Sequence, residues 1–188
     1  SLFFAFANTV VALNFQKTNE AHGWLGLQFQ LTPFGPTNYV VIHVRMRDDE
    51  NVLQQQALGI IGVNLMYGCF FYHKSPETLL LSLMDDLTSD RIEIDMVRFS
   101  GPDFEKVDNR LMSLRLVRNG FTDAALFGSD GGVLQPSEAL YKKHILMMRG
   151  RLRPITNVHI DLISNGQKQF LAEPDVDESK VVLVSELT

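Results

Sequence analysis

The sequence has a single cysteine, Cys69, among 188 residues. One cysteine excludes an internal disulfide framework and a cysteine-based zinc cluster, and such sparing use predicts a reducing, cytoplasmic location. Positive charge is also scarce, because 17 Lys and Arg stand against 22 Asp and Glu, a net charge of −5. This balance argues against a nucleic-acid partner, since a general nucleic-acid binder needs a basic surface for the phosphate backbone.

Long hydrophobic runs, internal repeats and low-complexity tracts are missing as well. The longest apolar stretch, residues 57–72, would span roughly 24 Å as a helix, short of the ~30 Å hydrocarbon core of a membrane. We therefore predict a buried core helix there and no membrane partner. No basic residue precedes the apolar start of the chain, so a secretory signal is not expected. The first residue is Ser1, and we expect the chain to be a fragment of a longer protein.

What the sequence does have is enough apolar material for a core. Hydrophobic residues make up 45% and charged residues 21%, which excludes wholesale disorder. A length of 188 residues fits one compact domain covering residues 1–188.

The first fifty residues predict β-strands at residues 10–15, 24–31 and 39–46. Leu25, Leu27 and Phe29 alternate with Gly26 and Gln28, the period of a sheet with one buried face. A turn-rich segment at residues 32–37 separates the second strand from the third. We expect these strands to form an antiparallel meander.

After residue 50 the pattern favours helices alternating with strands. Helices are predicted at residues 52–73, with Asn51 as cap and Gln54 completing a capping box, and at 76–87, with Ser75 as cap. A third helix is predicted at residues 104–119, and Gly120 would stop it. The expected core stripe of this helix is Val107, Leu111, Leu114 and Val117.

Further strands are predicted at residues 92–99, 122–127, 144–148 and 181–187, and a helix at 157–172. A tight turn at residues 128–132 is expected to join two short extended pieces, because it lacks the spacing of a phosphate loop. Strands alternating with helices of this length predict an α/β fold, in which a mixed sheet carries the N-terminal meander and βα units, with helices packed on the sheet.

A local reversal of charge marks the segment between Ala139 and Ile160. It contains no acidic residue. Its shape is an apolar strand, a glycine at 150, a basic loop, and Thr156 as a candidate helix cap. A helix start offers free backbone N–H groups, and arginine grips phosphate with a fork of donors, so the segment can form a phosphate cradle. An ordinary solvated loop is the alternative. The basic residues are Lys142, Lys143, Arg149, Arg151 and Arg153.

Residues 150–159, GRLRPITNVH, resemble the motif G-x-F-x-P-x-[H/T]-x-x-H of the nucleotidyltransferase superfamily of mononucleotide adenylyltransferases. Gly150, Pro154, Thr156 and His159 match the motif; Leu152, Arg153 and Val158 depart from it. In that family the motif lies between the first strand and first helix of a Rossmann-like domain. Residues 91–127 and 140–162 also resemble a larger bacterial family labelled nicotinamide mononucleotide adenylyltransferase.

The resemblance implies a nucleotide-phosphate-binding, nucleotidyltransferase-like domain. Thr156 and His159 would contact the triphosphate as catalytic residues, while Gly150, Arg151 and Arg153 would bind phosphate. If active, the protein would transfer adenylate from ATP, with Mg²⁺, to a mononucleotide. The alternative is a non-catalytic structural or oligomerisation domain of a larger bacterial protein, acting as a homo-oligomer or with the remainder of its chain.

Other candidates are weaker on sequence grounds. Oxygen-rich clusters such as Asp85, Asp86, Asp90, Glu93 and Asp95 can hold Mg²⁺, but for the first three a solvated helix end and turn is the simpler interpretation. The residues Asp103, Asp108, Asn109 and Arg110 follow a predicted strand and are candidates to line a cleft, although helix capping and surface solvation are the simpler interpretation. His22, His43 and His73 share no ligand spacing, so we expect structural histidines and no protein metal site. Cys69 is expected to be a buried apolar residue.

Overall fold

The computed structural model describes residues 4–187. They form two compact units, Ser1–Pro136 (unit 1) and Ser137–Thr188 (unit 2). The α/β fold class is confirmed, with five helices, a four-stranded antiparallel sheet and two smaller sheets.

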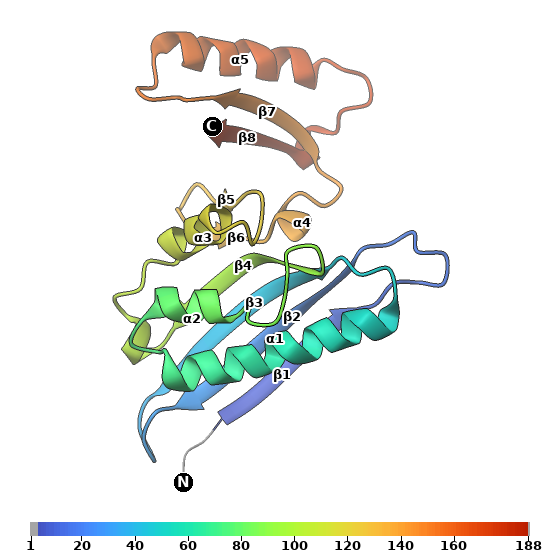
Figure 1. The fold of residues 1–188 in the computed structure, drawn as a ribbon. Helices are drawn as coiled ribbons and strands as arrows, with labels where there is room; N and C mark the ends of the chain where they lie inside the picture. Colours follow the sequence, from blue (N-terminus) through green and yellow to red (C-terminus); the bar gives the residue numbers. More distant parts are fainter. Residues whose placement is uncertain (1–3, 188) are drawn as a thin grey trace. The chain divides into compact units, whose positions relative to one another are not determined.

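Unit 1 is built on an antiparallel sheet in the order β1-β2-β3-β4 (Figure 1). Its strands are β1 (Phe4–Val11), β2 (Ala21–Gln30), β3 (Thr37–Met46) and β4 (Ile92–Ser100). The predicted meander is confirmed, but its first strand lies earlier than residues 10–15. The segment after β1 forms a turn instead, which the side chain of Asn19 holds in place. Asn19 Oδ1 accepts a hydrogen bond from Asn14 N–H at 2.7 Å, and Asn19 Nδ2 donates to the Ala12 carbonyl at 2.8 Å.

Helices α1 (Asn51–Phe71) and α2 (Pro76–Ser82) cover one face of this sheet (Figure 1). The alternating residues Leu25, Leu27 and Phe29 of β2 are all buried, as their period predicts. They meet Ile61 and Leu65 of α1 in a continuous hydrophobic core. The prediction of a buried core helix at residues 57–72 is therefore confirmed for the sheet-facing side of α1.

The helix ends differ in detail from the predicted caps. Glu50 takes the cap position of α1, and Gln54 donates to the carbonyl of Asp48 at 2.6 Å rather than completing a capping box. Ser75 takes the cap position of α2, as predicted, but its side chain contacts Thr78 Oγ1 and makes no capping hydrogen bond to the backbone. α2 ends at Ser82, five residues before the predicted 87. The chain beyond Ser82 bends into turns that carry Leu83 and Leu87 into the core.

The third helix, α3 (Asn109–Arg118), begins five residues later than predicted, and its expected core stripe was wrong. Leu111 and Leu114 are 53% and 50% exposed, while Met112 and Leu116 are buried. The late start explains the shift: Pro102–Phe104 forms a separate short 3-10 turn, and Asp108 caps α3 by accepting from Arg110 N–H. The predicted stop at Gly120 is confirmed by its positive φ of 71°.

The chain after α3 crosses the edge of β4. Ile94 N–H donates to the Phe121 carbonyl at 3.0 Å. The predicted turn at residues 128–132 then joins β5 (Leu126–Phe127) to β6 (Val133–Leu134), closed by a bond from Gly128 N–H to the Gly132 carbonyl. The short helix α4 (Pro136–Ala139) follows. This excursion brings Gln135 against the sheet face opposite α1.

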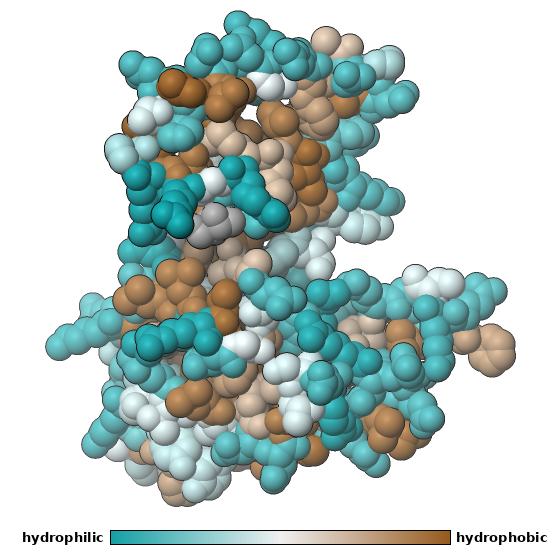
Figure 2. Space-filling model, turned by 45° about the horizontal axis from the view of Figure 1, so that its top comes forward, coloured by the Kyte–Doolittle hydropathy of each residue, from teal (hydrophilic) through white to brown (hydrophobic). Residues whose placement is uncertain are grey.

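Unit 2 is a single βαβ element, with β7 (His144–Gly150), α5 (Asn157–Leu171) and β8 (Val181–Leu187). β7 and β8 pair in parallel, as the βαβ pattern predicts, but in their own sheet rather than in one mixed sheet with the meander. Both strands are apolar on both faces, whereas a single helix can cover only one face. None of the residues of unit 2 within the described range is buried. Figure 2 shows hydrophobic side chains at the surface, among hydrophilic ones.

Among residues 4–187, no helix is long and apolar enough to cross a membrane.

Two glycines of α1 give a matched test of its packing. A Cβ at Gly68 would lie 3.0 Å from Ser82 Oγ and 3.1 Å from Leu79 Cγ, whereas a Cβ at Gly59 meets nothing within 4 Å. We expect Gly59→Ala to raise the free energy of unfolding by up to about 1 kcal/mol through helix propensity. Gly68→Ala should lower it by about 1 kcal/mol, because overpacking against α2 exceeds that gain. Urea unfolding of both variants checks this; equal shifts would contradict the packing of α2 on α1.

Candidate functional site

The predicted phosphate segment lies at the junction between β7 and α5. Gly150 ends β7, and Thr156 takes the cap position of α5 with extended backbone angles (φ −114°, ψ 165°). His159 follows in the first turn. The strand, loop and helix that the family resemblance implies are therefore present around these residues, in a parallel βαβ element.

Thr156 and His159 contact each other at the start of α5. His159 Nδ1 accepts a hydrogen bond from the Thr156 backbone N–H at 3.0 Å and lies 3.0 Å from Thr156 Oγ1. In return, His159 N–H donates to the Thr156 carbonyl at 3.0 Å. Because Nδ1 accepts, a neutral His159 ring carries its proton on Nε2. The ring thus presents a donor on the side away from the cap.

The basic residues of this segment differ in their partners. Arg151 and Arg153 are exposed on the connecting loop, and neither forms an ion pair with any residue in the range 4–187. Arg149, by contrast, pairs with Glu186 of β8 at 2.8 Å, and this hydrogen bond raises the pKa of the guanidinium above its ordinary value. Lys142 lies over the Tyr141 ring. The structure therefore leaves Arg151 and Arg153 as the two arginines of this loop without an acidic partner within the described chain.

The acidic residues of the run from Asp85 to Asp95 lie in two different environments. Asp85 and Asp86 lie exposed in the turns after α2, whereas Glu93 and Asp95 are buried in β4. Across the part of the chain that the structure describes, no group of three or more His, Cys, Asp or Glu side chains could hold a metal ion. Cys69 is buried as predicted, and burial raises the pKa of its thiol.

The cleft candidates after β4 are engaged in local structure. Asn109 clamps the backbone of β4, because its Oδ1 accepts from Phe99 N–H at 2.7 Å and its Nδ2 donates to the Phe99 carbonyl at 3.0 Å. Asp108 bonds to Arg110, and this interaction lowers the pKa of the Asp108 carboxyl. Asp103 does line a pocket of about 500 Å³, together with Leu31, Thr32, Pro36, Phe70, His73 and Lys74.

A second polar centre lies on the sheet face opposite α1, where the sequence predicts only separate structural histidines. His43 and Asp95 are 1% and 5% exposed, and His43 Nδ1 lies 2.6 Å from Asp95 Oδ1. A β-bulge at this position leaves Asp95 unpaired between Ile94 and Met96 and turns its carboxylate onto this face. Gln135 Nε2 donates to the other carboxylate oxygen at 3.1 Å.

Glu93 is the second buried carboxylate of this face. It accepts from Thr122 Oγ1 at 2.6 Å, from Arg47 at 2.9 Å and from Arg45 at 3.3 Å. Arg45 also reaches Glu20 at 2.7 Å. Period-2 alternation indicates the shared face of these residues but not their contacts. All of them occupy positions that point away from the hydrophobic face of their strands: His22, His43, Arg45, Glu93 and Asp95.

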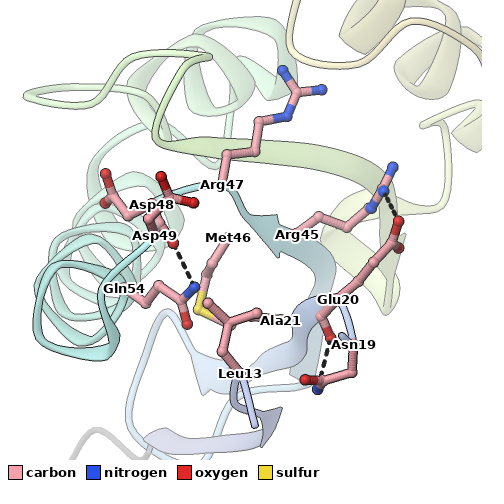
Figure 3. A pocket seen from close by; sticks show the side chains of 10 residues that line it. All are labelled: Leu13, Asn19, Glu20, Ala21, Arg45, Met46, Arg47, Asp48, Asp49 and Gln54. Carbon is pink, nitrogen blue, oxygen red and sulfur yellow. Dashed lines mark hydrogen bonds and ion pairs between the residues drawn. The ribbon is translucent and has the colours of Figure 1, made fainter. Parts of the chain in front are cut away.

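Next to this network is a pocket of about 190 Å³, shown in Figure 3. Leu13, Ala21 and Met46 lie in its middle, the paired Arg45 and Glu20 on one side, and Asp48 and Asp49 on the other (Figure 3). Within the described residues, Arg45 Nε is the one buried side-chain nitrogen or oxygen that lacks a hydrogen-bond partner. The pocket is small and carries charges of both signs, so its lining does not indicate a ligand class.

Comparison with protein families, with curated proteins and with solved structures finds no match to this chain. The functional assignment therefore depends on the residues themselves.

The Glu93 network predicts a large effect from a small change. Thr122→Val keeps the shape of the side chain but removes the hydroxyl donor to Glu93 Oε1, leaving a buried carboxylate oxygen short of a partner. We expect the free energy of unfolding to fall by about 1–3 kcal/mol in chemical denaturation. Thr9→Val, on the exposed strand β1, is the control and should change it by less than about 0.5 kcal/mol. Equal losses from both variants would contradict the network.

Proposed function

We propose that the start of α5 and the loop before it bind the phosphate groups of a nucleotide. The observation that carries the proposal is the contact of Thr156 with His159 at a helix N-terminus that follows a parallel strand. A helix start of this kind favours anions through its free N–H groups and its dipole. Exposed Arg151 and Arg153 on the same loop supply two uncompensated positive charges.

The donors would act together on one phosphate chain. Thr156 holds the His159 ring through its backbone N–H, and the capping box occupies the His159 N–H. His159 Nε2–H and the first two backbone amides of α5 can donate to phosphate oxygens, while the arginines neutralise charge. Gly150 has no side chain, and a Cβ there would meet only Leu152 Cδ2 at 3.9 Å, so the loop beside it is open.

If the site is catalytic, the family resemblance suggests adenylyl transfer from Mg-ATP to a mononucleotide. The residues of this chain would then position the triphosphate and stabilise the negative charge that builds up as pyrophosphate leaves. No covalent intermediate with the protein is needed for this chemistry. The metal ion would supply further neutralisation of the phosphate oxygens.

Titration with ATP by calorimetry tests the binding proposal. We expect the double variant Arg151→Gln/Arg153→Gln to bind ATP at least about tenfold more weakly, because each charged hydrogen bond contributes roughly 1.5–3 kcal/mol. His159→Ala should also weaken binding. Arg149→Gln is the matched control and should leave the affinity nearly unchanged, since Arg149 is held by Glu186.

Raised salt should weaken ATP binding to the unmodified protein, as expected for an electrostatic site. No measurable heat with ATP, or equal losses in the control and in the double variant, would contradict the proposal.

A second candidate function, self-assembly, is favoured by β1. This strand forms the edge of the sheet, pairs only with β2 in the described chain, and has all eight of its residues exposed. It carries no charge, proline or bulge, the devices that normally block edge-to-edge pairing. Phe4, Phe6 and Val10 lie on the same side of the strand, and Phe6 contacts Gly62 of α1.

A second copy fits this edge by symmetry. Antiparallel pairing of β1 with itself about Ala7 places Phe4 opposite Val10 and Ala5 opposite Thr9, and it keeps the apolar side of both strands on the same face. No charged pair is brought together. The two sheets would then form one continuous sheet across the dimer.

Light-scattering mass at high protein concentration tests this assembly. We expect a dimer for the unmodified chain and a monomer for Ala7→Lys, because the two lysines would lie opposite each other on the axis. Gln28→Lys on the inner strand β2 is the control and should remain dimeric. A monomeric mass for the unmodified chain at the highest concentration would exclude self-assembly through β1.

A further inference from the structure

The polar centre on the open face of unit 1 continues beyond His43 to a third residue, His22 of β2. His22 Nδ1 lies 3.1 Å from His43 Nε2, and the two ring centroids are 5.3 Å apart. The distance between the centroids exceeds the distance between the nitrogens by nearly the sum of the centre-to-nitrogen distances of the two rings. The two nitrogens therefore point at each other. Rings that shared a metal ion would instead point at a common third position.

The hydrogen bonds fix the proton positions along this chain. The Asp95 carboxylate can only accept, so the proton between Asp95 and His43 is on His43 Nδ1. A neutral His43 therefore has a lone pair on Nε2, and His22 must donate to it from Nδ1. This leaves the lone pair of a neutral His22 on Nε2, at the outer end of the chain Asp95–His43–His22.

The outer nitrogen is not fully buried. His22 is half-buried, and its Nε2 has no hydrogen-bond partner within residues 4–187. Among the described side chains, Arg45 Nε is the only buried nitrogen or oxygen without a hydrogen-bond partner. Because His22 Nε2 also lacks a partner, it cannot be a buried atom. The side chains behind it, His43 and Asp95, are buried.

We propose that His22 is a nucleophilic histidine for activated acyl groups, positioned by His43 and Asp95. An imidazole nucleophile becomes positively charged as its nitrogen bonds to a carbonyl carbon. A carboxylate behind a second imidazole stabilises that charge and holds the correct tautomer, as in catalytic triads. Here Asp95 is buried and held by Gln135, so this support is fixed in place.

An activated aryl ester would acylate His22 by displacement of its phenolate. Nε2 gives its electron pair to the carbonyl carbon, the bond from carbon to the leaving oxygen breaks, and the phenolate leaves with that electron pair. The Nδ1 proton of His22 can move toward His43. Water then attacks the acyl carbon, and the bond from carbon to Nε2 breaks with its electron pair returning to Nε2. The proton held by His43 returns to His22 Nδ1, and the carboxylic acid and one proton of the water leave to solvent.

His73 provides a control inside the same molecule. Its Nδ1 lies 3.0 Å from the Phe70 carbonyl, so its neutral ring also presents an unprotonated Nε2 on a half-buried side chain, but no carboxylate stands behind it. The two histidines therefore differ in the Asp95–His43 support and share the outer tautomer. A difference in their reactivity measures the effect of that support.

The test is reaction with diethyl pyrocarbonate, followed histidine by histidine with mass spectrometry. We expect His22 to be modified at least about tenfold faster than His73 in the unmodified protein. In Asp95→Asn, the His22 rate should fall to about that of His73 while the His73 rate stays the same. A parallel assay follows p-nitrophenolate release from p-nitrophenyl acetate, which should fall in His22→Ala and stay unchanged in His73→Ala.

Circular dichroism and protection of the buried Cys69 thiol establish that each variant is folded. The comparison of His22 with His73 in the unmodified protein needs no variant, so it stands even if Asp95→Asn does not fold. Modification of His22 no faster than His73 overturns the proposal. So does an unchanged His22 rate in folded Asp95→Asn, or nitrophenolate release that does not depend on His22.

Discussion

The burial of two carboxylates in one strand is the constraint on which unit 1 depends. Glu93 and Asp95 of β4 are 4% and 5% exposed, and removing such groups from water costs several kcal/mol unless they are fully paired. Their partners come from two parts of the chain: β3 and the residue after it supply His43, Arg45 and Arg47, and the segment after α3 supplies Thr122 and Gln135. These pairings therefore tie the late segment to the sheet and fix its path.

The two units solve the problem of burial differently. Unit 1 encloses its hydrophobic face beneath α1 and α2, and the segment that ends at Gln135 covers Asp95 on the opposite face, where His22 and Arg45 stay partly exposed. Unit 2 has two parallel strands with apolar residues on both faces and one helix to cover them. A parallel sheet is normally covered on both faces. Because both faces of β7 and β8 are apolar, one apolar face of unit 2 stays exposed whatever the register of the two strands.

Much of the element order could be predicted from the sequence, because alternation and caps are local signals. The strands at Trp24, Tyr39 and Ile92 and the helix capped by Thr156 follow from them. The stripe of α3 could not, since its phase depends on where Asp108 starts the helix. The contact between Thr156 and His159 could be predicted, because the two residues are three positions apart on one helix. The contact between Asp95 and His43 could not, because it requires a β-bulge and a strand pairing across 52 residues.

The two candidate sites show how the same side chain is given opposite chemistry by one hydrogen bond. At the start of α5, His159 Nδ1 accepts from a backbone N–H, so the outer nitrogen of a neutral ring is a donor suited to an anion. On β2, His22 Nδ1 donates to His43, so the outer nitrogen is a lone pair suited to an electrophile. The difference arises because a helix start presents N–H donors, so His159 Nδ1 accepts. A buried carboxylate only accepts, so His43 must donate to Asp95, and a neutral His43 then accepts a hydrogen bond from His22. Backbone geometry thus selects the tautomer at one site, and a buried charge selects it at the other.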